Sequence, residues 1–260
     1  MAAELDVVEF TDPWCSWAWG TEPKLRRLRW RYGDRLRWRT VMGDLVPERP
    51  DVDAVAAAPT IAGYWQGVNK HTGMPWPEGL RWAPGRSAVA GRAVKAAQLQ
   101  SADAGDRLLR ALRESCFIHG APADDATRIL VVAHRVAGLD AARLAADLDG
   151  EEVGRAFESD REETRHPNEY VLTLQETHEG KGNARQEGDR WRYVFPTILF
   201  RGAGGEHTVP GWQPWARYVE AMEAAAPGST DGGRPDPTPE EAHAEWPGLT
   251  DAELRVICGT

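Results

Sequence analysis

The chain has 260 residues, of which 42% are hydrophobic and 27% are charged, and its formal net charge is −9 at pH 7. These values are typical of a globular protein with one sizeable core, and they argue against nucleic acid or an acidic membrane surface as a partner. The sequence has no run of about 18 apolar residues, so it predicts no membrane span. The N-terminus enters an apolar pattern without a basic and apolar leader, which predicts a cytoplasmic protein.

Two strands and a helix are predicted at the start of the chain. Residues 5–11 form an apolar run typical of a buried strand, and residues 36–42 alternate in a way that predicts a strand with one buried face. Between them, apolar side chains at helical spacing from Leu25 to Tyr32 predict a helix, which Pro23 is expected to kink or restart. A strand, a helix and a parallel strand in this order indicate an α/β fold.

A cysteine lies where the first strand gives way to the first helix, within the stretch Asp12-Pro13-Trp14-Cys15-Ser16-Trp17-Ala18-Trp19-Gly20. A helix start offers free N–H groups and the positive end of the helix dipole, and both favour the thiolate over the thiol. We therefore expect Cys15 to be the reactive centre rather than a structural cysteine. Asp12 is expected to cap the helix or to supply local charge, and Ser16 to cap it or to place a hydroxyl near the sulfur.

The middle of the chain is predicted to be mostly helical. Residues 46–86 are rich in Pro, Gly and Trp with little periodicity, which predicts an irregular but ordered cover. Residues 87–165 repeat apolar side chains at helical spacing, which predicts a helical subdomain that His166-Pro167 ends. Residues 178–190 contain three glycines and many charges, which predicts an exposed loop acting as an added flap.

A strand, a helix and a helical tail are predicted towards the C-terminus. Residues 206–209 favour a short strand, and apolar spacing in residues 215–222 predicts the last helix of the core. Residues 227–239 form a linker rich in Pro, Gly and Asp. Two capping boxes, which start at Thr238 and Thr250, then predict two short helices whose apolar side chains must dock on the rest of the molecule.

Residues 191–200 are apolar and rich in β-forming residues, which predicts a buried strand, yet Pro196 lies in the middle of them. A proline removes a hydrogen-bond donor from the ladder, so it is expected only where the chain needs a turn or lies at a sheet edge. On the residues alone, Pro196 is either a trans proline of an edge strand or a cis proline at a functional turn.

The motif around Cys15 resembles the active-site signature of the DsbA-like branch of the thioredoxin superfamily, which includes FrnE-type proteins and the 2-hydroxychromene-2-carboxylate isomerases. That signature reads Cys-x-x-Cys, whereas Ala18 occupies the second position here, either naturally or by substitution. The resemblance implies an α/β thioredoxin fold with an inserted all-helical subdomain and, in this chain, a short helical C-terminal tail. The thioredoxin-fold core is expected at residues 1–45 and 191–226, the inserted cover, subdomain and flap at 46–190, and the linker and tail at 227–260.

The resemblance also implies roles for the residues of the motif. Cys15 is implied to be catalytic, with supporting roles for its neighbours Pro13, Trp14, Ser16, Trp17 and Ala18. The branch carries a cis proline that faces the cysteine, which implies substrate binding by Phe195, Pro196 and Thr197. The tryptophans beside Cys15 either cover the first helix as core residues or line an apolar groove for a peptide or a small aromatic molecule.

The other two cysteines receive different predictions. Cys116 falls on the apolar face set by Leu109 and Leu112, so we expect it to pack in the core. Cys258 lies at the apolar edge of the tail, where it either docks the last helix or acts as a remote resolving thiol for Cys15. Three cysteines are too few for a disulfide framework, and the seven histidines show no ligand spacing, so no metal site is predicted.

Three functions are compatible with Ala18, because a dithiol oxidase needs its second cysteine to expel the substrate. The first and favoured one is a DsbA/FrnE-like oxidoreductase that uses Cys15 alone on a protein dithiol or disulfide, with a low-molecular-weight thiol or Cys258 completing the cycle. The second is an isomerase or transferase of the same fold, which acts on a small aromatic substrate with a thiol cofactor. The third is a non-catalytic adaptor. No tightly bound cofactor is expected.

Overall fold

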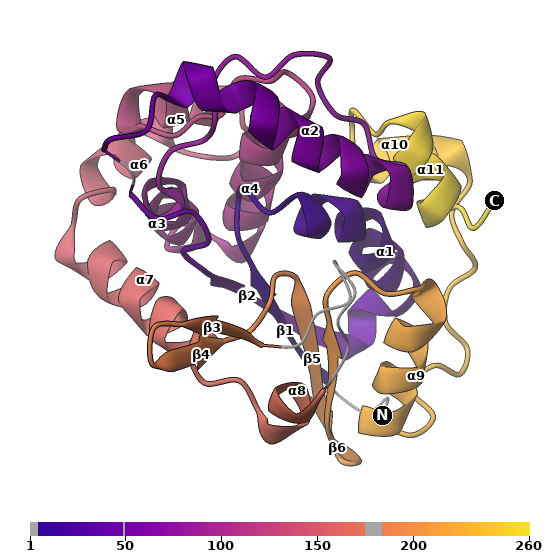
Figure 1. Ribbon diagram of the computed structural model, residues 1–260. Coiled ribbons are helices and arrows are strands. Elements are labelled where there is room, and N and C mark those ends of the chain that lie inside the picture. The colour runs from indigo at the N-terminus through magenta and orange to yellow at the C-terminus, as the bar shows by residue number, and fades with distance from the viewer. Residues whose placement is uncertain (1–4, 49, 175–183) are drawn as a thin grey trace.

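The computed structural model describes residues 5–48, 50–174 and 184–260. At its centre lies a four-stranded sheet in the order β2-β1-β5-β6 (Figure 1). The strands are β1 (Leu5–Thr11), β2 (Leu36–Met42), β5 (Thr197–Gly202) and β6 (Gly205–Pro210). β2 runs parallel to β1, whereas β5 is antiparallel to both β1 and β6. The predicted α/β thioredoxin-type core is therefore confirmed.

Helices α1 (Ser16–Tyr32) and α9 (Trp215–Ala225) cover one face of this sheet. Leu25 and Leu28 of α1 pack there in one hydrophobic cluster with residues of β1, β5 and β6. The predicted restart of the helix at Pro23 is wrong, since α1 runs through this residue without interruption. The missing N–H of proline removes one helical hydrogen bond, and we attribute the intact helix to its packing against the sheet, which outweighs that loss.

The prediction of an irregular cover at residues 46–86 is wrong, because this segment contains the helix α2 (Ala54–Thr72). The carboxylate of Asp53 accepts hydrogen bonds from the N–H groups of Val55 and Ala56, and Gly73 ends the helix with φ +70°. The end of α2 lies against α1 (Figure 1). A Cβ at Gly20 of α1 would collide with the side chain of Thr72, so glycine permits this close approach.

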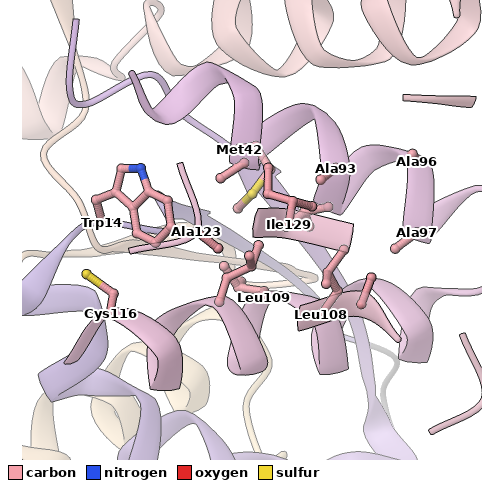
Figure 2. Packing of buried hydrophobic residues seen from close by; sticks show 14 of the residues in the cluster. Trp14, Met42, Ala93, Ala96, Ala97, Leu108, Leu109, Cys116, Ala123 and Ile129 are labelled. Atoms are coloured by element: carbon pink, nitrogen blue, oxygen red, sulfur yellow. The ribbon is translucent and has the colours of Figure 1, made fainter. Parts of the chain in front are cut away.

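The predicted helical subdomain is present at residues 87–164. Its helices are α3 (Ser87–Gln98), α4 (Ala102–Phe117), α5 (Ala126–Ala133), α6 (Ala141–Asp147) and α7 (Glu151–Thr164). Cys116 is fully buried on α4, near Trp14, as the apolar pattern predicts (Figure 2). The carboxylate of Asp160 on α7 accepts a hydrogen bond from the N–H of Met42 at 2.9 Å, which joins the subdomain to the end of β2.

Three predictions between residues 166 and 200 are wrong in detail. His166-Pro167 does not end the helices, because α8 (Glu169–Thr173) follows with Asn168 as its N-cap. The predicted loop at 178–190 includes the strand β3 (Arg185–Glu187) and the start of β4 (Arg190–Arg192), which form a hairpin, while residues 178–183 lie outside the described residues. The predicted strand at 191–200 is divided between β4 and β5, since Pro196 cannot donate a ladder hydrogen bond.

The predicted tail consists of α10 (Pro239–Glu245) and α11 (Asp251–Ile257), and both helices begin with the expected capping boxes. α11 packs against α1. Glu253 of α11 is fully buried, and its carboxylate accepts hydrogen bonds from the Arg110 guanidinium at 2.5 and 3.0 Å. In the described part of the chain, no helix combines the length and the apolar character that crossing a membrane requires.

Replacing Glu253 by alanine is expected to detach the tail and to lower the free energy of unfolding by about 3 kcal/mol, since buried Arg110 loses a charged partner. Limited proteolysis should then cut the linker at 227–238 faster than in the parent protein, and urea denaturation measures the loss of stability. The matched control is Glu240→Ala on the exposed surface of α10, which should change neither readout. Equal proteolysis of the parent and Glu253→Ala would contradict the docking role.

Candidate functional site

Cys15 lies at the junction of β1 and α1, as the sequence predicts. It is the N-cap residue of α1, and its Sγ accepts a hydrogen bond from the N–H of Ala18 at 3.4 Å. The thiol donates in turn to the carbonyl oxygen of Phe195 at 3.1 Å, across 180 residues of sequence. Only 4% of Cys15 is exposed. The sulfur is therefore held between the first turn of a helix and the backbone that precedes β5.

Phe195, Pro196 and Thr197 lie beside Cys15, as the resemblance implies. The Phe195–Pro196 peptide bond is cis. The carbonyl oxygen of Pro196 accepts a hydrogen bond from the N–H of Gly211 at 2.7 Å, and the Thr197 hydroxyl donates to the carbonyl oxygen of Val194 at 2.7 Å. These bonds fix the backbone that faces the sulfur.

Gly43 is a site residue that the sequence interpretation missed. A Cβ at this position would collide with the ring of Phe195, so only glycine lets this ring lie against the end of β2. The glycine directly after a predicted strand was the available signal, but its partner lies about 150 residues further along the chain.

Asp12 is not the cap of α1, because Cys15 occupies the N-cap position. Its buried carboxylate instead accepts hydrogen bonds from the N–H groups of Trp14 and Leu45, both at 2.8 Å, and so ties the loop after β1 to the segment after β2. Burial raises the pKa of Asp12 to about 6, although these hydrogen bonds oppose the shift. Ser16 is the first residue of α1 and also lies buried at the site.

The prediction that Cys15 is a thiolate near neutral pH is wrong. Burial raises the pKa of the thiol to about 11, and the N–H of Ala18 lowers it by less than burial raises it. The negative charge of Asp12 adds to the increase, while Arg113 opposes it. A helix start favours a thiolate only where the sulfur keeps access to solvent or to a strong cation, and neither holds for Cys15 in this structure.

Alkylation by iodoacetamide at pH 7.4 is therefore expected to label Cys258 before Cys15, since Cys258 is partly exposed. Labelling of Cys15 should rise by about tenfold per pH unit from pH 8 to 10, because the thiolate fraction grows with pH below a pKa of about 11. Peptide mapping after brief pulses measures both rates. A plateau in the Cys15 rate near pH 7 would show instead that the thiolate is stabilised.

A cavity of 370 Å³ opens in front of Cys15. Trp14 and Trp17 line it, whereas Trp19 packs in the core with its ring 5.8 Å from that of Phe117. The interpretation of these tryptophans as a groove lining therefore applies to Trp14 and Trp17, and their interpretation as core residues applies to Trp19. Ser16 and Phe195 also line the cavity, so the structure brings most of the predicted site residues together around it.

The outer wall of the cavity comes from residues that the sequence interpretation missed. Tyr64 on α2 accepts a hydrogen bond from the Trp17 indole at 3.0 Å. Arg185 and Arg192 of the β3–β4 hairpin lie on another side, with the Arg192 guanidinium 4.9 Å from the centre of the Phe195 ring. Tyr64 and Arg185 fall in segments predicted as irregular, and Arg192 falls in the predicted strand at 191–200, so nothing in the sequence placed these side chains at the site.

Cys258 does not lie at this site. It packs with Ala242, Leu249 and Ile257 of the tail, in a cluster separate from that of Cys15. The adjacent Gly259 approaches the guanidinium of Arg27 on α1. Positions 15 and 27 are about 18 Å apart along the helix axis, so Cys258 does not resolve a disulfide at Cys15 in this conformation.

Comparison with known sequences identifies both a family and relatives. A family model described as Thioredoxin matches residues 9–168. The chain is 29% identical over 222 residues to the ClpXP adapter protein SpxH of Shouchella clausii, covering 84% of this chain and 66% of that relative. It is 27% identical to SpxH of Bacillus subtilis, covering 85% and 75%. A further SpxH, from Halalkalibacterium halodurans, is 29% identical over 62% of this chain and 54% of its own length, so the chain spans only part of these relatives.

Solved structures with the same fold share little sequence. A protein from Nitrosomonas europaea described as a protein disulfide isomerase aligns with a TM-score of 0.65 at 15% identity, covering 85% of this chain and 96% of that one. The cytosolic disulfide reductase DsbM from Pseudomonas aeruginosa aligns with a TM-score of 0.57 at 17% identity, covering 84% and 93%. These neighbours are of the DsbA type, and the likeness is one of fold.

Proposed function

We propose that this chain, which belongs to the thioredoxin family, is a non-catalytic adapter that binds a partner protein at the Cys15 cavity. One observation carries this proposal, the state of the Cys15 thiol: it is buried, donates a hydrogen bond to the Phe195 carbonyl oxygen, and faces a methyl group at Ala18 where a resolving thiol would be needed. A protonated and unresolved thiol is a poor catalyst of disulfide exchange. The cavity in front of it is nevertheless intact and offers apolar walls to a partner.

The curated relatives support the same proposal. The ones described above are named ClpXP adapter proteins, and two of them align over more than four fifths of this chain. We expect the partner-binding surface of this chain within the thioredoxin-fold core that carries the cavity. We infer that the retained fold serves recognition rather than turnover.

A single-cysteine oxidoreductase is the second candidate, favoured by the N–H of Ala18 that points at the sulfur. In this scheme the Cys15 thiolate attacks a protein disulfide, which releases one thiolate and leaves a mixed disulfide. A low-molecular-weight thiol then attacks that bond, returns Cys15 to the thiol and leaves with the other half of the substrate. A thiol-dependent reaction on a small aromatic substrate would need the same thiolate.

Partner binding is expected to survive loss of the sulfur and to fail when the cavity wall is charged. Affinity capture under reducing conditions should recover the same partners with the parent and with Cys15→Ser, but not with Ile61→Asp, which places a carboxylate in the lining. Val131→Asp, at an exposed position of α5, is the matched control and should capture normally. Loss of capture in Cys15→Ser, or turnover of insulin by the parent, would favour the oxidoreductase.

A further inference from the structure

The charged side chains that line the cavity are of one sign. The lining includes Arg185 and Arg192, and no aspartate or glutamate among the described residues. The whole chain has 40 acidic and 31 basic side chains, so an acid-free surface runs against its composition. The remaining walls are largely apolar, from α2, the segment after β2 and the motif tryptophans. The cavity therefore combines apolar walls with a local positive charge.

The two arginines are direct neighbours in the hairpin. Arg185 of β3 lies opposite Arg192 of β4, so both side chains lie on the same face. Like charges at directly opposed positions destabilise a two-stranded ladder. Such a pair is tolerated where a negative charge lies close to both guanidinium groups.

The carboxylate of Glu187 lies close to one of these two arginines. Its Oε1 accepts a hydrogen bond from the Arg192 guanidinium, and its Oε2 lies 4.0 Å from the Arg165 guanidinium. No described carboxylate lies within ion-pair distance of Arg185. Glu187 thus pairs with Arg192 and Arg165 but not with Arg185, which leaves uncompensated positive charge at the edge of the cavity.

One residue that lines the cavity carries an unpartnered hydrogen-bond donor. The indole N–H of Trp14 is buried without a partner in the described part of the chain, and Trp14 lines the cavity. Val52 and Tyr64 line it as well, although each is close to half exposed, so they form an apolar rim. An apolar side chain that enters between them would bury this rim.

We propose that the partner recognised at the Cys15 cavity presents an acidic segment, with an apolar side chain in the cavity and a carboxylate against Arg185 and Arg192. This inference rests on the proposed adapter function and names its partner class. Because the chain as a whole is negative, long-range attraction of an acidic partner is weak, and selectivity depends on this local pair. Binding is therefore expected to weaken as the salt concentration rises.

The test uses three fluorescein-labelled decapeptide libraries that share Phe and Leu at half of their positions. The other positions hold Asp and Glu in the acidic library, Lys and Arg in the basic one, and Ser and Gln in the neutral one. Fluorescence anisotropy with the full chain is expected to show the acidic library binding about tenfold more tightly than the neutral one. Arg185→Glu should remove this preference, while Arg217→Gln, an exposed arginine on α9, should keep it.

Each outcome separates the two proposals. Equal binding of all three libraries would overturn the acidic partner and leave the adapter function standing. Binding of none of them would overturn both. An unchanged preference in Arg185→Glu would overturn the role of the hairpin, and displacement of the acidic peptides by micromolar naphthoate would show that the cavity takes a small aromatic acid rather than a protein segment.

Discussion

Ala18→Cys is expected to turn this protein into a disulfide reductase, with turnover of insulin in the presence of a reducing thiol where the parent shows none. Residues 15 and 18 lie one helical turn apart, so their Cβ atoms are about 5–6 Å from each other. Bridged Cβ atoms lie about 3.5–4.5 Å apart, and a modest rotation of the first turn closes that gap. The N–H of Ala18 already points at the Cys15 sulfur, so the backbone needs little rearrangement.

The physical reason for the large effect is kinetic. In the parent, a mixed disulfide at Cys15 persists until an external thiol attacks it. In Ala18→Cys, a second thiol in the same helical turn attacks it within the molecule. Well-oriented intramolecular groups reach effective concentrations of about 10⁵ M or more, which no dissolved thiol approaches. The new thiol can also donate a hydrogen bond to the Cys15 thiolate, so the pKa of the pair should fall below about 11.

Ala18→Ser is the matched control, because it adds an atom of similar size without a thiol. It should remain inactive and should bind partners like the parent. Thiol counting after mild oxidation is the second readout: Ala18→Cys should lose two thiols at the site, and Ala18→Ser none. Two free thiols in oxidised Ala18→Cys, with no turnover, would mean that the cavity no longer supports exchange chemistry of any kind.

Strands and capped helices could be predicted because their signals are local. β1 and β2 follow from apolar runs and alternation, and both capping boxes of the tail are visible within four residues of sequence. α2 could not be recognised, because it lies over the cavity as a cover and buries few side chains, among them Ala58, Trp65 and Val68. A helix with so narrow a buried face leaves little periodicity to detect.

The sequence predicted where the motif residues lie around Cys15 but not the electrostatics of this cysteine. The motif placed Cys15 at a helix start, and a helix start by itself favours thiolate. The carbonyl oxygen of Phe195 that accepts a hydrogen bond from the thiol lies 180 residues away, and the burial that raises the pKa of Cys15 comes from packing that joins distant segments. The cavity wall at Arg185 and Arg192 depends on a hairpin whose register the sequence pattern did not reveal.

Glu22→Gln is expected to be the most destabilising substitution that leaves the cavity untouched, with a loss of about 3–5 kcal/mol in the free energy of unfolding. The Glu22 carboxylate lies on α1 between the guanidinium groups of Arg26, Arg110 and Arg113, with contacts of 2.7, 3.1 and 3.1 Å. Arg113 in turn donates to the hydroxyl of Thr11 at 2.6 Å, at the end of β1. The cluster therefore joins α1, α4 and the sheet.

Glutamine cannot replace this carboxylate, since its amide nitrogen would face an arginine donor and the buried guanidinium groups would lose their counter-charge. The matched control is Glu114→Gln. Among the described residues, Glu114 forms an ion pair with Arg110 alone, and its side chain is 30% exposed, so it should contribute about 1 kcal/mol or less. Urea denaturation at pH 7 compares the two variants with the parent.

The pH dependence provides an independent check of the same cluster. Burial alone would raise the pKa of Glu22, but the attraction of Arg110, Arg26 and Arg113 outweighs it and holds the pKa well below its usual range. A carboxyl whose folded pKa is lowered contributes its stability above the unfolded pKa of about 4.3 and loses it as the pH falls towards the folded value. The difference between parent and Glu22→Gln should therefore be greatest near pH 7 and shrink on acidification below pH ~4. A difference that stays constant from pH 7 to pH ~3 would show that Glu22 acts through packing rather than through its charge.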